Sequence, residues 1–257
     1  MQVQCCRTNR RRSKGDFRAE RIEMNRRRYK SPIPKSAREV VDKAYSDGAK
    51  EASSYFVGRT MVGRRVWWDD GQTVFLEYGV KDGKKHGNEM QFHRNGLLLS
   101  VEPHRDGKAH GKATQFAANG SVLICYVLKN GVGMDLWCDD DGNLSEEHYY
   151  PAKGELGYNR WWNEDNKSIW REESWLDGLG WHGILREWNG KGRLCRGFPQ
   201  FYVNGQRLTK SQYLRACQTD QSFPPYDPEQ NQPFRTLPSE YLAQRPKRRM
   251  KGGVQDH

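Results

Sequence analysis

The stretch DGKKHGNEMQFHRNG, residues 82–96, places two turn signals on either side of a short run suited to a strand. Its Asp82-Gly83 and Asn95-Gly96 dipeptides accept the positive φ angles that tight hairpin turns require. The residues between them have the length of an ordinary strand. DGKAHGKATQFAANG, residues 106–120, repeats the pattern 24 positions later. The stretch therefore predicts one unit of a repeated β-hairpin.

The repeat extends beyond these two copies. Six glycines start the copies at spacings of 22 to 26 residues, and an aromatic residue follows five positions later in five of the six. A fixed period in this range indicates a repeat architecture in which neighbours stack. We assign structural roles to these glycines and aromatic residues, namely Gly63, Gly87, Gly111, Gly133, Gly157 and Gly183 with Trp68, Phe92, Phe116, Trp162 and Trp188.

The predicted fold class is mainly β. We expect an elongated single-layer antiparallel β-meander of about six 22–26-residue hairpin repeats, with short capping helices at both ends. Two capping-box patterns support the helices, Ser36 with Glu39 before the repeats and Thr209 with Gln212 after them. The expected organisation is a basic disordered tail (1–35), a short helical cap (36–57), the repeats (58–205), a helical and extended cap (206–238) and a basic disordered tail (239–257).

The net charge of +11 is concentrated at the ends of the chain. Residues 1–43 carry +9 and residues 240–257 carry +3, whereas the body between them carries −1. A nucleic-acid groove would place its charge along the folded surface, so solvated tails are favoured over a nucleic-acid site. Met24 is a second candidate start, because residues 1–23 carry no structural signal.

Strand parity assigns the repeat side chains to two faces, because alternate residues point in opposite directions. The face that carries the repeat aromatics is mostly apolar. The other face is mostly polar, and three tryptophans stand out on it: Trp67, Trp137 and Trp161. Exposed aromatics on a rigid sheet are typical binding hot spots, so these three are the candidate partner-binding residues. The alternative is that a flanking helix or the C-terminal tail covers them.

The residues EYGVKDGKKHGNEMQFHRNG, 77–96, resemble the MORN repeat (membrane occupation and recognition nexus), whose pattern is Y-x-G-x-x-x-x-G-x-x-H-G followed by an aromatic and another glycine. They are closer to the bacterial variant found in proteins grouped with toxin–antitoxin or immunity partners. The resemblance covers about residues 58–205 and is weaker in the later copies, where the His-Gly pair is absent until residues 182–183. It implies a single-layer antiparallel sheet that is used for binding and has no activity of its own.

The sequence favours no catalytic, metal or cofactor site. His86, His110 and His182 share a repeat position, but at two strands per repeat they are too far apart to share one ion. None of the six cysteines forms a C-x-x-C pair, so reduced thiols are expected. Nucleophile-elbow, phosphate-loop and zinc-protease motifs are absent from the sequence. We therefore expect a protein that is not an enzyme.

The first hypothesis is a cytoplasmic scaffold that binds another protein, such as a toxin or a partner encoded nearby. The second is a nucleic-acid-associated protein that uses the basic tails for affinity and the tryptophans for stacking. The third is recruitment to a membrane surface by the basic tails, although the sequence has no amphipathic anchor and no stretch of about 18 apolar residues. An apolar sheet face would also allow self-association.

Overall fold

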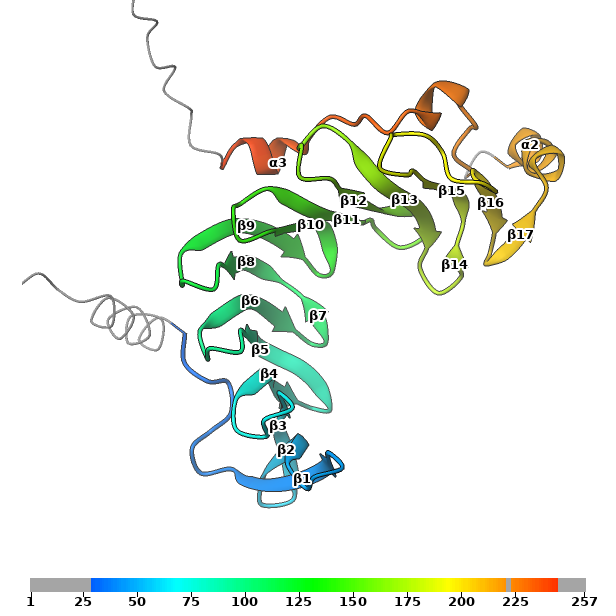
Figure 1. Cartoon of the computed structure of the whole chain (residues 1–257). Helices are drawn as coiled ribbons and strands as arrows, with labels where there is room; N and C mark the ends of the chain where they lie inside the picture. The colour runs from blue at the N-terminus through cyan, green and yellow to red at the C-terminus, as the bar shows by residue number, and fades with distance from the viewer. Residues whose placement is uncertain (1–28, 221–222, 245–257) are drawn as a thin grey trace, which may run out of the picture. The chain divides into compact units, whose positions relative to one another are not determined.

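The computed structural model describes residues 29–220 and 223–244. Seventeen strands within these residues make an open antiparallel sheet, and the helical elements are few and short. The mainly-β meander expected from the sequence is confirmed. The chain divides into two compact units, Met1–Val101 with Phe116–Ser121 (unit 1) and Glu102–Gln115 with Val122–His257 (unit 2). Figure 1 shows the strands following one another as hairpins within each unit.

Each strand is short and most pair with the next strand along the chain. The strands of unit 1 are β1 (Arg38–Ala44), β2 (Lys50–Val57), β3 (Thr60–Trp67), β4 (Val74–Lys81) and β5 (Lys84–Phe92). Both units share residues of β6 (Leu98–Arg105) and β8 (Gly111–Phe116). The strands of unit 2 are β7 (Lys108–Ala109), β9 (Val122–Lys129), β10 (Val132–Cys138), β11 (Leu144–Tyr150), β12 (Leu156–Trp162), β13 (Ile169–Leu176), β14 (Gly180–Trp181), β15 (Gly183–Glu187), β16 (Gln200–Val203) and β17 (Gln206–Leu208).

The turn dipeptides act as the sequence predicts. Asp82-Gly83, Asp106-Gly107, Asn130-Gly131 and Asn204-Gly205 have positive φ at both residues, which is the geometry of the two-residue hairpin turn. In the wider turns, the amide of the dipeptide's glycine donates a hydrogen bond to the carbonyl three residues earlier. Gly96, for example, donates to the His93 carbonyl at 2.8 Å. These two kinds of turn alternate along the repeat.

The N-terminal capping helix predicted for residues 36–57 is wrong. These residues form β1 and β2, which pair with each other, so the sheet starts before residue 58 in the sequence. The Glu39 side chain does not form the capping box, because its carboxylate accepts hydrogen bonds from Lys50 and Tyr55. Val40 and Val41 are β-branched and favour a strand once a partner strand is available. The turn between the strands uses Gly48 at φ 86°.

The C-terminal capping helix is confirmed. Helix α2 (Lys210–Thr219) begins at Thr209, whose side chain accepts from the Gln212 amide while the Gln212 side chain accepts from the Thr209 amide. A 3-10 turn, η1 (Pro228–Asn231), and helix α3 (Ser239–Leu242) follow. The predicted tail therefore begins too early, because residues 239–244 are ordered around the buried Tyr241.

The N-terminal tail was also predicted to extend too far. Within unit 1, Ile33 is buried and its side chain lies over Gly63. The ring of Tyr29 contacts Phe116 edge to face, with the ring centroids 5.9 Å apart. Residues 29–35 therefore belong to the folded unit, because they supply apolar cover to it. The rest of both predicted tails, residues 1–28 and 245–257, lies outside the described residues.

The core follows the repeat aromatics. In unit 1, Met90, Leu98, Val101 and Phe116 form one buried cluster. Unit 2 has two clusters, a long one that includes Trp162 and Trp188 and a second one around Tyr213 between β16 and α2. Trp68 and Phe92 are half-buried, whereas Phe116, Trp162 and Trp188 are fully buried, so the first two copies bury their aromatics less completely than the later ones.

Candidate functional site

Two of the three predicted tryptophans lie on the same face of unit 2. Trp137 on β10 and Trp161 on β12 occupy one register row, on either side of Glu146 on β11. The row continues to Arg171 on β13. Alternation then places further residues of β10 to β14 on this face, which we name the tryptophan face: Asp135, Trp137, Glu146, His148, Tyr150, Asn159, Trp161, Arg171, Glu173, Trp175 and Trp181.

The C-terminal segment packs on the opposite face of unit 2. Glu172, which alternates with Arg171 and therefore points the other way, accepts two hydrogen bonds from Arg235 at 3.0 and 2.9 Å. Trp188 Nε1 donates to the carbonyl of Asn231 at 2.7 Å. The segment thus covers the apolar face, which would otherwise be exposed to water. The tryptophan face is the other surface of the sheet.

Aromatic and charged groups hold the rings of the tryptophan face in place. Trp161 meets His148 edge to face at 5.8 Å and Trp170 at 5.9 Å, and the Arg171 guanidinium lies 5.5 Å from its ring centroid. Trp170 lies at the register shift between β12 and β13, where alternation is interrupted, and its contact with Trp161 adds it to the tryptophan face; it is 41% exposed. Trp137 and Trp161 are half-buried. The rings are thus fixed in position and remain partly exposed to solvent.

Trp67 belongs to unit 1 and is not brought together with the other two. Its Nε1 donates to the Ser53 hydroxyl at 3.4 Å, and the Lys50 ammonium lies 5.0 Å from its ring centroid. The Arg65 guanidinium lies 6.0 Å from the same ring. Its side chain is half-buried among these groups. The candidate site is therefore built from the residues of unit 2.

A hollow of about 520 Å³ opens on the tryptophan face and was not predicted from the sequence. Its walls include Tyr150, Trp175 and Trp181, and its polar groups are Asn159, Glu173 and Asp177. We name these six residues the aromatic hollow. The signal that could have found it is the alternation of Arg171, Glu173 and Trp175 on β13, one of the strands that the repeat alignment left out.

Gly157 shapes the aromatic hollow. A Cβ at this position would lie 2.5 Å from two atoms of the Trp175 indole, so the ring rests over the bare backbone of β12. Trp175 thereby reaches Tyr150 on β11, with the ring centroids 5.6 Å apart. The structural role of this repeat glycine is thus to let a ring approach the backbone closely.

The electrostatics of the tryptophan face are acidic. Burial raises the pKa of Tyr150, and the negative charges of Asp135, Glu102 and Glu146 raise it further. Burial also raises the pKa of Asp135. Burial alone would lower the pKa of His148, but hydrogen bonds with Glu146 and Asn159 outweigh it and raise that pKa. A cation approaching this face is therefore favoured over an anion.

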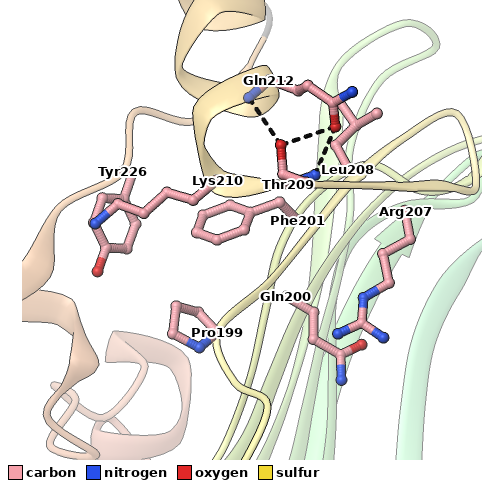
Figure 2. A pocket seen from close by; sticks show the side chains of 9 residues that line it. All are labelled: Pro199, Gln200, Phe201, Arg207, Leu208, Thr209, Lys210, Gln212 and Tyr226. Atoms are coloured by element: carbon pink, nitrogen blue, oxygen red, sulfur yellow. Dashed lines mark hydrogen bonds between the residues drawn. The ribbon is translucent and has the colours of Figure 1, made fainter.

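A larger hollow of about 640 Å³ lies beside helix α2 (Figure 2). The Lys210 ammonium lies 4.3 Å from the ring centroid of Tyr226 on one side of it, and Arg207 extends along the other side. Figure 2 shows the Thr209 side chain turned toward Gln212 in the capping box. The polar groups at the start of the helix are therefore already engaged in the fold.

A third hollow, of about 460 Å³, is lined by the charged groups that attach the C-terminal segment. Glu172 accepts from Arg160, Arg186 and Arg235, so three guanidiniums converge on one buried carboxylate. Burial alone would raise the pKa of Glu172, but hydrogen bonds from Arg235 and the charge of Arg160 outweigh it and lower the pKa to about 2. This cluster is a structural ion-pair network.

Within residues 29–220 and 223–244, no group of three or more His, Cys, Asp and Glu side chains is placed to hold a metal ion. His182, from the predicted histidine row, stacks on Phe223 with the ring centroids 4.5 Å apart. Cys125, Cys138, Cys195 and Cys217 are free thiols, and Cys5 and Cys6 lie outside the described residues. No helix of the described part of the chain is long and apolar enough to cross a membrane.

The fold and the site together define an antiparallel β-hairpin repeat protein with a fixed aromatic and acidic face. Comparison with protein-family models found no match, and comparison with curated proteins found none. The resemblance to MORN repeats consequently rests on the turn dipeptides and aromatic positions of the sequence itself.

Proposed function

We propose that this chain is a non-enzymatic β-repeat scaffold that binds another protein through the tryptophan face of unit 2. The observation that carries the proposal is the asymmetry of the sheet. One face is closed by the chain's own C-terminal segment, through Arg235 and Asn231, while the other holds fixed aromatic rings with open edges. Aromatic side chains that are held rigidly lose little entropy on binding, and they dominate protein interfaces for that reason.

The composition of the face indicates the chemistry of the partner. Trp161 and Trp170 offer apolar area, and Asp135, Glu146 and Glu173 offer negative charge. A complementary surface would bring apolar groups surrounded by basic ones. Nucleic acid is disfavoured at this face because its phosphates would meet carboxylates. The MORN-like repeats favour an antitoxin or immunity-type partner binder in the cytoplasm, where the free thiols would stay reduced.

The test is capture of partners from a nuclease-treated lysate of the native host. The full chain is compared with Trp161→Ala, Trp170→Ala and the control Val127→Ala, whose side chain is 64% exposed on β9. We expect the two tryptophan variants to lose specific proteins that the wild type and the control retain. Circular dichroism confirms that each variant is folded. Recovery of the same proteins by all four chains would show that the tryptophan face is not the binding surface.

A further inference from the structure

We infer that the aromatic hollow binds a cationic side chain, lysine or arginine, of the partner protein. The inference rests on the proposed function, because the hollow is part of the tryptophan face. In this proposal, Tyr150, Trp175 and Trp181 select the partner by binding one of its basic residues.

The three rings come from three different strands. Tyr150 closes β11, Trp175 lies near the end of β13, and Trp181 is its register partner on β14. The Tyr150 and Trp175 rings are inclined at 59° and so form a corner. Trp181 is 37% exposed and is held from behind by Tyr202, at a centroid distance of 4.9 Å. Ring faces that meet at angles around a space attract a cation through their quadrupoles.

The charged residues that line the hollow are Glu173 and Asp177, both acidic. Asp177 lies at the exposed β13–β14 turn, and the Glu173 side chain is only 12% exposed. The Arg171 guanidinium donates to Glu173 Oε2 at 3.0 Å, and Arg171 belongs to the neighbouring register row. The negative charges that raise the pKa of Tyr150 act on the same space. A basic side chain therefore meets both ring faces and carboxylates here.

Asn159 fixes the hollow at its floor. Its Oδ1 accepts from Trp175 Nε1 at 3.2 Å, and its Nδ2 donates to Glu173 Oε1 at 3.1 Å. Ring and carboxylate are thus set relative to each other by one amide. A site whose groups are already in place pays little to order them when a ligand binds. A neutral apolar side chain would cover the rings but would also take the carboxylates of Glu173 and Asp177 out of water without supplying a cation.

The test uses three blocked tripeptides, acetyl-Gly-Lys-Gly-amide, acetyl-Gly-Arg-Gly-amide and the neutral norleucine analogue acetyl-Gly-Nle-Gly-amide. They are titrated into the full-length protein while the indole N–H resonances of Trp175 and Trp181 are followed by NMR. We expect the lysine and arginine peptides to shift both resonances and the norleucine peptide to shift neither. Trp181→Ala should weaken cation binding about tenfold, because a ring that stabilises the ion is removed.

Glu173→Gln keeps the shape of the side chain and removes its charge, so it should reduce the preference for lysine over norleucine, while the rings and Asp177 remain. Val127→Ala is the matched control and should bind as the wild type does. Equal binding of norleucine and lysine would overturn the inference. Absence of binding to the full chain would also overturn it. Binding that appears only after deletion of residues 245–257 would overturn the choice of occupant, because the chain's own basic segment would then fill the hollow.

Failure of this inference can be separated from failure of the proposed function. If Trp161→Ala abolishes partner capture while no tripeptide shifts the indole resonances of Trp175 and Trp181, the tryptophan face binds a partner without recognising a cation. If the tripeptides bind as expected and every variant captures the same proteins, the hollow binds cations outside the interface with the partner. Capture of the same proteins by every variant removes the proposed function and the partner as the occupant, whereas absence of tripeptide binding alone removes only this inference.

Discussion

Replacing Glu172 by Gln should destabilise unit 2 by removing the charge on which its C-terminal segment is anchored. The Glu172 side chain is 8% exposed and accepts hydrogen bonds from Arg160, Arg186 and Arg235. Arg235 reaches it from 63 residues further along the chain, in a two-bonded arrangement. The variant leaves three guanidiniums around a neutral amide. Burial already lowers the pKa of Arg186, so these cations have little water to replace the lost carboxylate.

The magnitude follows from the pKa of Glu172 and from general experience of buried ion pairs. A carboxyl whose pKa falls from 4.5 to about 2 on folding contributes about 3 kcal/mol of stability at neutral pH. Breaking a buried ion pair costs about 3–5 kcal/mol. The two figures agree, so we expect a loss of about 3 kcal/mol in the free energy of unfolding at pH 7.

The pH dependence has a definite sign. The folded pKa lies below the unfolded value, so the contribution is complete well above pH 4.5 and is lost as the pH falls toward 2. The difference between wild type and Glu172→Gln should therefore shrink to about half its neutral value near pH 3.

The assay is urea unfolding followed by tryptophan fluorescence, because seven of the nine tryptophans lie in unit 2. Glu164→Gln, at an exposed turn of the same unit, is the matched control and should change stability by less than about 0.5 kcal/mol. A loss below about 1 kcal/mol for Glu172→Gln at pH 7 would contradict the reasoning. A difference that is the same at pH 7 and pH 3 would contradict the assigned cause.

Three further predictions address the packing and the site. Gly157→Ala should displace the Trp175 indole, because the new Cβ would lie 2.5 Å from it. NMR should show a shifted indole resonance and weaker binding of the lysine tripeptide. An unchanged resonance would refute the packing role. Tyr213→Ala should cost about 3–5 kcal/mol in urea unfolding, because this fully buried ring packs between Phe201 and Phe223. Thr209→Ala should cost about 1 kcal/mol and reduce helicity by circular dichroism, since it removes the cap of α2; an unchanged midpoint would show that the capping box adds no stability.

Local chemistry made the hairpin turns and helix α2 predictable from the sequence. A dipeptide such as Asp82-Gly83 adopts positive φ because glycine has no Cβ and the short aspartate side chain tolerates this region. Thr209 caps a helix with a residue three positions away. The same kind of signal failed for residues 36–57. Ser36 and Glu39 have the spacing of a capping box, but pairing of β1 with β2 outweighs it, and pairing is not visible in a local pattern.

The candidate site was predictable only in part, for a similar reason. Parity placed Trp137 and Trp161 on one face, because both lie on repeat strands that the alignment covered. Trp175 and Trp181 lie on β13 and β14, which fall between the aligned positions, and a register shift beside Trp162 changes the count there. The contact of Arg235 with Glu172 joins residues far apart in the sequence, so no local sequence pattern predicts it.

The most direct test of the central claim is site-specific photocrosslinking on the tryptophan face. p-Benzoylphenylalanine replaces Trp170, which is 41% exposed beside Trp161, or Val127 as the control in the same unit. Both full-length proteins are irradiated in cells of the native host, and adducts are identified by mass. We expect a discrete protein adduct from position 170 that is absent from position 127. Equal adducts from both positions, or none from position 170, would contradict it.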